Sequence, residues 1–375
     1  MSVKRINEIC TKGTSNLKQK DVEGENGIYP VYGASGLISK VDFYQQENEY
    51  IAIVKDGSGI GRVTFLPPKS SVIGTMQYIL PIKGFDIKYV CYCLQSLDLT
   101  KYKQGAAIPH IYFRDYGERL VNVTEDSKEQ ERIVKILDAA FEKIGRLKEN
   151  AEKGLQEVKN LWQATVTRIF SNLNDTIKLS NVAKISSGFA FKSNVFKKDG
   201  KYQILRIGNV KQGKVLYNSS PIFIDEMNSA ELKKAELLIN DLVITQTGTK
   251  NKRDYGFVSL IQRKNLLLNQ RVAKVRVVDP NFLPKFFLYY SYTENYKTQY
   301  FSNEGGTVGQ GNVGISALTD MLVPYPDIEE QKKVVETLDK IQNICQNIQS
   351  KYEQELSEYE ALKQSILRKA FSGEL

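Results

Sequence analysis

Residues 328–375 read IEEQKKVVETLDKIQNICQNIQSKYEQELSEYEALKQSILRKAFSGEL, and a related stretch lies earlier in the chain. Residues 128–173 read KEQERIVKILDAAFEKIGRLKENAEKGLQEVKNLWQATVTRIFSNL and align with the later stretch at a shift of 201 without a gap. Twelve residues are identical over the 45 aligned positions from Glu129 to Leu173. A repeat at a fixed shift predicts two copies of one structural unit.

Both stretches are predicted to be long helices with one narrow apolar stripe. Neither contains proline, and apolar residues recur about every 3.5 residues. A helix of this length extends about 68 Å, so its stripe must be buried against another long element. The other copy is the simplest partner, which predicts an intramolecular antiparallel coiled coil; two independent helices packed on unrelated surfaces are the alternative. The expected seam residues are Ile133, Leu137, Ile144, Leu155, Val334, Leu338, Ile348 and Leu356.

The repeated helices divide the chain into four parts. Two globular segments, 1–126 and 173–326, alternate with the helical segments 127–172 and 327–375. Both globular segments contain short runs of β-branched and aromatic residues bounded by Gly, Pro or Asp, which predict strands. Each also has one shorter helix, and in the second segment we expect it over Pro284–Asn295. The expected fold class is α/β, more specifically α+β, with a pseudo-twofold repeat.

Composition is that of a water-soluble globular protein, with 41% hydrophobic and 25% charged residues. No apolar run is long enough to span a membrane, and the first residues lack the apolar core of a signal peptide. Four cysteines in 375 residues do not make a disulfide framework. We therefore expect a cytoplasmic location.

The positive charge is concentrated in one part of the chain. The net charge is +9, and residues 173–326 alone contain 21 Lys and Arg against 12 Asp and Glu. Residues 1–126 are almost neutral, with 15 against 14. A basic segment of this kind is consistent with a polyanionic partner such as nucleic acid.

No motif for catalysis, metal binding or nucleotide binding is complete. The glycine-rich loop Asp56–Gly61 lacks the spacing of a dinucleotide-binding loop and precedes a further strand rather than a helix. A second glycine-rich stretch, Gly305–Gly314, is expected to be a loop. The single histidine, His110, and the pair Cys91 and Cys93 have no companions that would complete a zinc site. We expect no catalytic residue, no metal and no cofactor on this chain.

Residue types that read DNA cluster in a few loops. Arg recognises guanine, Asn and Gln recognise adenine, and Lys and Thr hold phosphates. For each such residue, a solvated charged loop is the alternative interpretation. The candidate DNA-binding residues are Lys55, Ser58, Arg62, Lys103, Gln104 and Arg114 in the first globular segment, and Gln246, Thr247, Thr249, Lys250, Asn251, Lys252, Arg253, Arg263, Lys264, Asn269 and Arg271 in the second.

These features together resemble the specificity subunit of type I restriction-modification systems. Both helices begin with a related motif followed by Leu-Asp, Glu129-Gln-Glu-Arg-Ile-Val in the first and Glu330-Gln-Lys-Lys-Val-Val in the second. The end of the chain, LKQSILRKAFSGEL at Leu362–Leu375, is similar to the end of the family's distal helix. The segments DLVITQTGT at Asp241–Thr249 and GAAIPHI at Gly105–Ile111 resemble recurrent segments of its target recognition domains.

The resemblance implies a DNA-reading function without catalysis. Each globular segment is then a target recognition domain that reads one half of a bipartite, asymmetric site in double-stranded DNA, and the helices set the spacing. Two methylation subunits, which bind S-adenosylmethionine, and restriction subunits, which use ATP and Mg²⁺, are the implied partners; no membrane is involved.

Three alternatives remain open at this point. The chain could serve a methylation-only system or another multisubunit restriction system. It could be a methyltransferase with its own specificity, although the cofactor and Pro-Pro-aromatic motifs are missing. It could also be a coiled-coil adaptor without a role on DNA.

Overall fold

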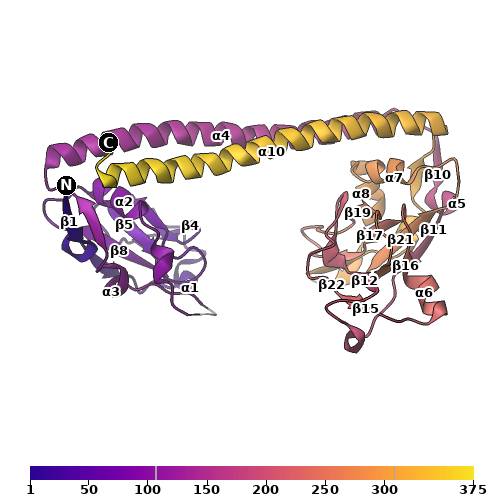
Figure 1. Cartoon of the computed structure of the whole chain (residues 1–375), viewed down its shortest axis with the longest axis horizontal. Helices are drawn as coiled ribbons and strands as arrows, with labels where there is room; N and C mark the ends of the chain where they lie inside the picture. Colours follow the sequence, from indigo (N-terminus) through magenta and orange to yellow (C-terminus); the bar gives the residue numbers. More distant parts are fainter. Residues whose placement is uncertain (106–107, 308) are drawn as a thin grey trace. The chain divides into compact units, whose positions relative to one another are not determined.

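The structure, a computed structural model, describes residues 1–105, 108–307 and 309–375 (Figure 1). It divides into two compact units. Unit 1 comprises Met1–Lys153 and Tyr352–Leu375, and unit 2 comprises Gly154–Lys351. The boundaries therefore fall inside the two long helices, whereas the repeat alone suggested boundaries at the helix ends.

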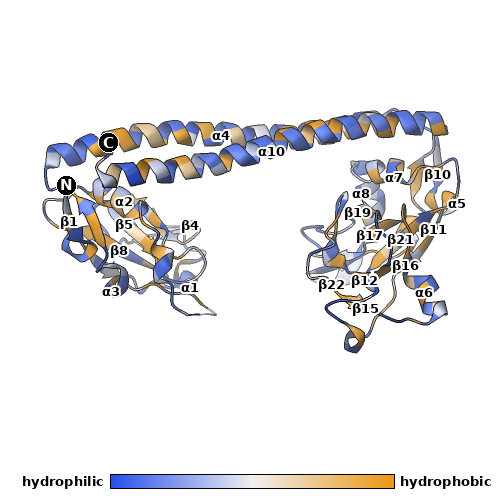
Figure 2. Cartoon of the chain, in the orientation of Figure 1, coloured by the Kyte–Doolittle hydropathy of each residue, from blue (hydrophilic) through white to orange (hydrophobic). Residues whose placement is uncertain are grey.

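The two long helices have equal length. Helix α4 spans Ser127–Ser171 and helix α10 spans Ile328–Ser372, each with 45 residues. Hydrophobic and hydrophilic residues alternate in bands along both helices (Figure 2). An aspartate precedes each helix and accepts a hydrogen bond from a first-turn amide, as expected of a residue that caps a helix N-terminus. No helix in the described residues is long and apolar enough to cross a membrane.

Unit 1 is built around a four-stranded sheet with the order β2-β8-β5-β6 and a three-stranded sheet with the order β4-β3-β7, while β1 pairs with β9. Its strands are β1 (Ser2–Arg5), β2 (Cys10–Thr14), β3 (Tyr29–Gly33), β4 (Gly36–Val41), β5 (Tyr50–Val54), β6 (Val63–Leu66), β7 (Ser71–Val72), β8 (Met76–Pro81) and β9 (Leu120–Val123). Its shorter helices are α1 (Gln19–Val22), α2 (Ile87–Gln95) and α3 (Phe113–Tyr116), with 3₁₀ turns at Ile6–Glu8 and Leu99–Tyr102.

Unit 2 has sheets with the orders β11-β21-β17-β19, β15-β12-β20-β16 and β18-β23-β22, and the pairs β10-β24 and β13-β14. Its strands are β10 (Thr176–Lys178), β11 (Ala183–Ser187), β12 (Tyr202–Leu205), β13 (Val210–Lys211), β14 (Lys214–Val215), β15 (Phe223–Ile224), β16 (Glu236–Leu237), β17 (Leu242–Thr245), β18 (Thr247–Gly248), β19 (Val258–Leu260), β20 (Leu266–Leu268), β21 (Val272–Val277), β22 (Gly305–Thr307), β23 (Gln310–Asn312) and β24 (Leu322–Pro324). Its shorter helices are α5 (Leu179–Val182), α6 (Ser229–Ala235), α7 (Pro284–Tyr290), α8 (Glu294–Phe301) and α9 (Ser316–Thr319), with 3₁₀ turns at Ser193–Val195 and Ile207–Asn209.

The two units repeat one topology. The central sheet of unit 1 matches that of unit 2 strand for strand, with β5 and β17 in equivalent places. Beside each central sheet lies one parallel strand pair, β3 with β7 in unit 1 and β12 with β20 in unit 2. The predicted pseudo-repeat and mixed α/β class are confirmed.

Within unit 1, the start of α4 packs against the end of α10. Ile133 and Leu137 share a core with Leu367 and Phe371. Further along, Lys148 Nζ lies 2.7 Å from a carboxylate oxygen of Glu360. Rising numbers on one helix thus meet falling numbers on the other, so the helices pair in the antiparallel sense that the sequence predicts.

Within unit 2, the end of α4 and the start of α10 enter a single core. Val166 and Phe170 lie in it with Leu338, and Phe170 packs on the ring of Phe286 in α7. Of the eight residues expected in the seam, Ile133, Leu137, Ile144 and Leu338 are buried, while Leu155, Val334, Ile348 and Leu356 are half-buried. The long helices therefore bury part of their stripe against the sheet domains rather than only against each other.

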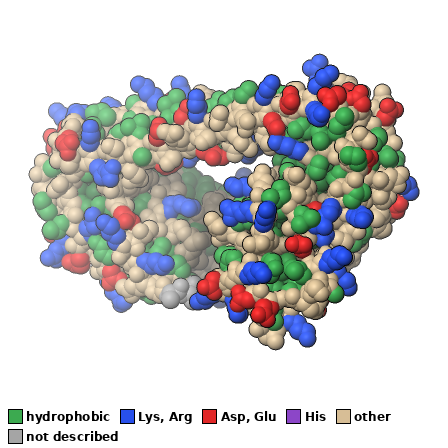
Figure 3. All heavy atoms as spheres, turned by 45° about the vertical axis from the view of Figure 1, so that its right-hand side comes forward, with side chains coloured by type: hydrophobic (Ala, Val, Ile, Leu, Met, Phe, Trp, Pro, Cys, Tyr) green, Lys and Arg blue, Asp and Glu red, His purple; other side chains and the backbone are tan. Residues whose placement is uncertain are grey.

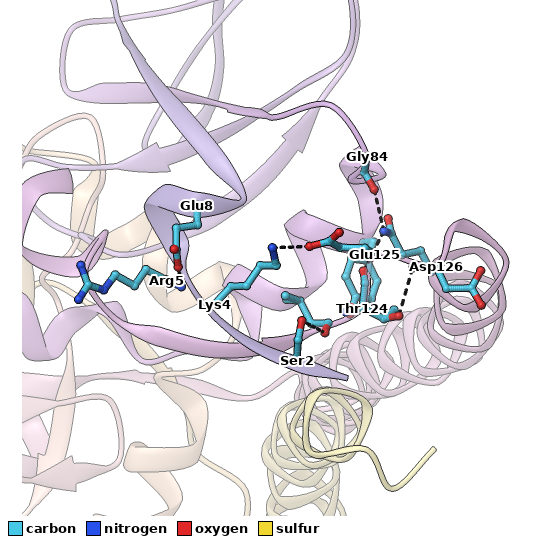
Figure 4. A network of polar contacts seen from close by, with 11 residues as sticks. Ser2, Lys4, Arg5, Glu8, Gly84, Thr124, Glu125 and Asp126 are labelled. Atoms are coloured by element: carbon cyan, nitrogen blue, oxygen red, sulfur yellow. Dashed lines mark hydrogen bonds and ion pairs between the residues drawn. The ribbon is translucent and has the colours of Figure 1, made fainter.

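A buried glutamine ties the start of each long helix to its unit. The side-chain amide of Gln130 donates to the carbonyl oxygens of Gly84 and Thr124 and accepts from the backbone amide of Asp86. Figure 4 labels Gly84 and Thr124. In the same way, Gln331 donates to two carbonyl oxygens and accepts from a backbone amide at the start of α7. Each amide thus pairs three backbone groups that would otherwise be buried without partners.

A second polar contact repeats about two helical turns further along each long helix. In unit 1, the Asp138 carboxylate accepts from Lys88 Nζ at 2.8 Å and from the Tyr92 hydroxyl. In unit 2, the Asp339 carboxylate accepts from Lys285 and Tyr289. Burial and the neighbouring carboxylate raise the pKa of both tyrosines. These contacts dock α2 and α7 on the long helices.

The helix expected over Pro284–Asn295 is in fact two helices. Helix α7 ends at Tyr290, and α8 begins at Glu294 after Thr293, whose hydroxyl accepts from the Tyr296 amide. Side-chain capping by Thr293 competes with continuation of the first helix. The prediction of one helix was wrong because the apolar pattern continues across the break.

We expect Leu338→Ala to destabilise unit 2 by about 2–5 kcal/mol, because it removes a fully buried side chain and leaves a cavity. Urea denaturation followed by fluorescence of Trp162, the single tryptophan, measures the change in this unit. Ile344→Ala on the same helix is the matched control, because Ile344 is 58% exposed and should change stability by under about 0.5 kcal/mol. Equal effects of the two substitutions would contradict the assigned packing.

Candidate nucleic-acid interface

In unit 2, a polar loop follows the buried strand β17 and carries the densest group of predicted DNA-binding residues. The turn is closed by Asp254, whose carboxylate accepts from the Thr249 backbone amide at 2.6 Å and pairs with its hydroxyl at 3.2 Å. The first of these hydrogen bonds does most to lower the pKa of Asp254. A side chain at Gly248 would meet that carboxylate at 2.5 Å, so this turn requires glycine.

The tip of the loop is open to solvent. Asn251 and Lys252 are exposed, and Lys250 is half-exposed. The exposed side chain of Arg253, in contrast, has two partners. Its guanidinium carbon lies 4.8 Å from the centre of the Phe301 ring, and its Nη2 atom lies 3.5 Å from Glu304 Oε2. Lys250, Asn251 and Lys252 can therefore reach a ligand freely, whereas Arg253 has partners within the unit.

Two predicted residues at the base of the loop are buried instead. Gln246 is 6% and Thr247 is 9% exposed, because the chain continues here into strand β18. The backbone amide of Gln246 donates to the Arg271 carbonyl oxygen at 2.9 Å, which brings the β20–β21 turn beside the loop. In that turn, Asn269 and Arg271 line a cavity of about 440 Å³ together with Arg206.

Arg263 and Lys264 are not brought to this loop. The Ile261 amide donates to the carbonyl oxygen of Asp241, which precedes β17, so the segment after β19 lies at the opposite end of the strand. There the Arg263 guanidinium carbon lies 4.2 Å from the centre of the Tyr217 ring. The predicted residues of unit 2 thus form two groups, separated by the length of β17.

In unit 1, the loop after β5 contacts the segment before α3. The His110 Nδ1 atom lies 2.7 Å from Asp56 Oδ1, and Lys55 Nζ lies 3.7 Å from the other carboxylate oxygen. The side-chain amide of Gln104 donates to the Asp115 carboxylate at 2.8 Å. Four of the six predicted residues lie on these two segments, namely Lys55, Ser58, Lys103 and Gln104, and Arg114 lies in α3 directly after the second segment.

Arg62 points elsewhere. Its Nη1 atom donates to the Ala34 carbonyl oxygen at 2.7 Å. It also lines a cavity of about 220 Å³ with Gln95 and with Lys363 of α10. The Arg62 side chain therefore has a partner within unit 1, while its backbone stays beside Val54, next to Lys55.

Sequence reasoning missed a basic cavity on the central sheet of unit 2. Its volume is about 430 Å³, and its cationic lining residues are Lys184, Lys233, Lys234, Lys274 and Arg276. Lys274 is 6% exposed, and burial is the main cause of its lowered pKa. Lys and Arg side chains recur across the face of unit 2 that Figure 3 brings forward. The alternation of basic and apolar residues along Val272–Val277 was the available signal for the lysine on this face.

The glycine-rich stretch expected as a loop at Gly305–Gly314 contains the hairpin β22–β23. Residues 106 and 107 of the segment GAAIPHI, and residue 308 of the glycine-rich stretch, lie outside the described residues. In the part of the chain that the structure describes, no group of His, Cys, Asp and Glu side chains could hold a metal ion.

One protein-family model matches both copies of the repeat. The family model described as "Type I restriction modification DNA specificity domain" matches residues 1–156 and 173–358. Two matching stretches, each covering most of one copy of the repeat, agree with the duplicated topology.

Two curated relatives are specificity subunits of type I restriction enzymes. The type I restriction enzyme MjaVIII specificity subunit of Methanocaldococcus jannaschii is 25% identical over 396 residues, which cover 97% of this chain and 90% of the relative. The EcoBI specificity subunit of Escherichia coli is 28% identical over 201 residues, which cover 53% of this chain and 39% of the relative.

A chain from a structural study of complex assembly and conformational transition of the type I R-M system is similar in fold, with a TM-score of 0.72 and 15% identity over 100% of this chain and 98% of that one. The HsdS subunit from Thermoanaerobacter tengcongensis has a TM-score of 0.51 and 17% identity, with coverage of 100% and 97%.

Replacement of both Lys250 and Lys252 by Ala should reduce the salt dependence of duplex binding. Each lost phosphate contact lowers the slope of log K against log salt by about 0.9, so we expect a decrease of up to about 2 for the assembled complex. Fluorescence anisotropy with a labelled duplex across a salt series measures it. Lys198→Ala with Lys201→Ala is the control, because it removes the same charge from exposed residues of the same unit that line neither the loop nor the basic cavity. An unchanged slope in the loop variant would exclude this loop as a phosphate contact.

Proposed function

The chain belongs to the family of type I restriction modification DNA specificity domains, and from this premise we propose that it is the DNA specificity subunit of a type I restriction-modification complex. The duplicated fold carries the proposal, because each copy matches the family and each presents a polar loop after its central strand. Two diverged copies can read two different half-sites, so the complete site need not be a palindrome.

The helices set the spacing between the half-sites. In this proposal, the target recognition domains are residues 1–126 and 173–326. The spacer consists of residues 127–172 and 327–375. Support comes from the equal lengths of α4 and α10 and from their uninterrupted helical backbone across the boundary of the two units. A continuous helix resists bending far better than a loop of the same length, so it can fix a distance.

Catalysis belongs to partner subunits in this proposal. Two methylation subunits bind S-adenosylmethionine and modify adenine, and restriction subunits use ATP and Mg²⁺ to translocate and cleave DNA. This chain supplies the double-stranded DNA contacts and the surfaces on the helices and domains where the methylation subunits dock.

Methylome sequencing of cells with and without the gene tests the proposed function. We expect a gapped motif with methylated adenine that disappears when the gene is deleted and returns when it is restored. Deletion of a coiled-coil adaptor without a role on DNA would leave the set of methylated motifs unchanged, and that result would refute the proposal.

Lengthening both helices together tests the spacer. Insertion of four helix-forming residues after Lys153 and after Lys351 adds about 6 Å to each helix, which corresponds to about two base pairs at 3.4 Å each. We expect methylation of the same two half-sites with a spacer about two base pairs longer. Insertion in only one helix is the control, because it shifts the helices out of register and should abolish specific methylation. Retention of the original spacer by the double insertion would disprove this role of the helices.

A further inference from the structure

The loops after β5 and β17 meet a second segment through the same backbone contacts in the two units. In unit 1, the Ile111 amide donates to the Lys55 carbonyl oxygen at 2.9 Å. In unit 2, the Val313 amide donates to the Gln246 carbonyl oxygen, also at 2.9 Å. Ile111 and Val313 are both buried, which fixes the register of each contact.

This register pairs one residue of each unit with its structural equivalent. Asp56 lies opposite His110 in unit 1, and Thr247 lies opposite Asn312 in unit 2. A third segment pairs on the other side, so that Gln104 lies opposite His110, and Gly305 lies opposite Asn312. Side chains of residues paired across strands project from the same face. We call Asp56, His110 and Gln104 row 1, and Thr247, Asn312 and Gly305 row 2.

The two rows share a backbone and differ in chemistry. Row 1 carries a carboxylate, an imidazole and an amide, while row 2 carries a hydroxyl, an amide and no third side chain. Three adjacent strands extend over about 10 Å, and this span matches about three base-pair steps at 3.4 Å each. Equivalent positions with different hydrogen-bonding groups are what two domains need to read two different sequences.

The central member of each row can contact a ligand. The His110 side chain is 38% exposed, and its Nδ1 atom is committed to Asp56. A carboxylate partner makes Nδ1 the protonated nitrogen of the neutral ring and leaves Nε2 as an acceptor. Asn312 is exposed, and among the described residues its side-chain amide has no hydrogen-bond partner. Such an amide can donate to and accept from one adenine edge.

Cationic side chains lie next to both rows. Lys55 and Lys103 adjoin row 1 in the chain, and the Arg114 guanidinium carbon lies 4.8 Å from the ring centre of Tyr112 near His110. Beside row 2, Arg271 is joined to Gln246 by a backbone hydrogen bond. Cations beside a polar row match the division of a DNA interface into phosphate contacts and base contacts.

We propose that His110 and Asn312 are equivalent specificity-determining residues, each of which reads a base edge in the major groove of the half-site bound by its own unit. This inference rests on the proposed function. Asp56 acts as a positioning residue because it fixes the orientation of the His110 ring. Thr247 is too deeply buried to contact a base and supports Asn312 from the adjacent strand.

Selection from randomised duplexes by the assembled complex tests the proposal. Wild type should select a bipartite motif. His110→Asn should change the preferred base pair in one half-site, and Asn312→His should change it in the other half-site. Each variant should bind the original site about tenfold more weakly or worse, in line with the loss of one base contact.

The control is Asn303→His, which makes the same exchange at an exposed residue that precedes the same hairpin and should leave the motif unchanged. If both variants select the wild-type motif with unchanged affinity, the inference is wrong while the proposed function stands. If wild type selects no motif, the proposed function itself fails. Should His110→Asn prevent assembly, the result for Asn312→His decides alone, because Asn312 has no side-chain partner to lose within the described structure.

Discussion

Two buried side-chain amides determine how the start of each long helix is oriented on its sheet domain. A sheet domain and a helix that passes it can meet in many orientations if only apolar surface joins them, because the hydrophobic effect has no direction. Gln130 and Gln331 remove that freedom, since each must pair three backbone groups at once. Any rotation of the helix start relative to its sheet leaves buried donors or acceptors unpaired, at about 1–3 kcal/mol for each group. The position of the strand-end loops relative to the helix depends on this geometric requirement.

The long helices and the duplication could be predicted because their signals are local and repeated. A period of 3.5 residues over twelve turns cannot be confused with any other structure, and the second copy confirms the first. Most strands of the smaller sheets could not be predicted. Several have only two or three residues, such as β10 and β18, and they exist because distant segments pair with them. The break between α7 and α8 depends on one threonine in a continuous apolar pattern, so periodicity could not reveal it.

Sequence-based prediction of the candidate site was also incomplete, because the surroundings of single residues depend on distant parts of the chain. Polarity identified Asn251 and Lys252, which are exposed, and Lys250, which is half-exposed, but it equally selected Gln246 and Thr247, which are buried. Composition alone could not show that β17 separates Arg263 from that loop. His110 was set aside as a lone histidine because its partner Asp56 lies 54 positions away in the chain. Pairing across strands, not proximity in sequence, defines the two rows.

The division of the chain into units has a consequence for biosynthesis. Unit 2 is one continuous segment, Gly154–Lys351, whereas unit 1 is completed by Leu367, Ala370 and Phe371 near the end of α10. During translation, unit 2 can therefore finish folding while unit 1 still exposes part of its apolar core. A chain that ends between Lys351 and Leu367 would contain all of unit 2 but lack part of the core of unit 1. The later-made unit is therefore the earlier to mature, and unit 1 depends on residues of α10 that are made after all of unit 2.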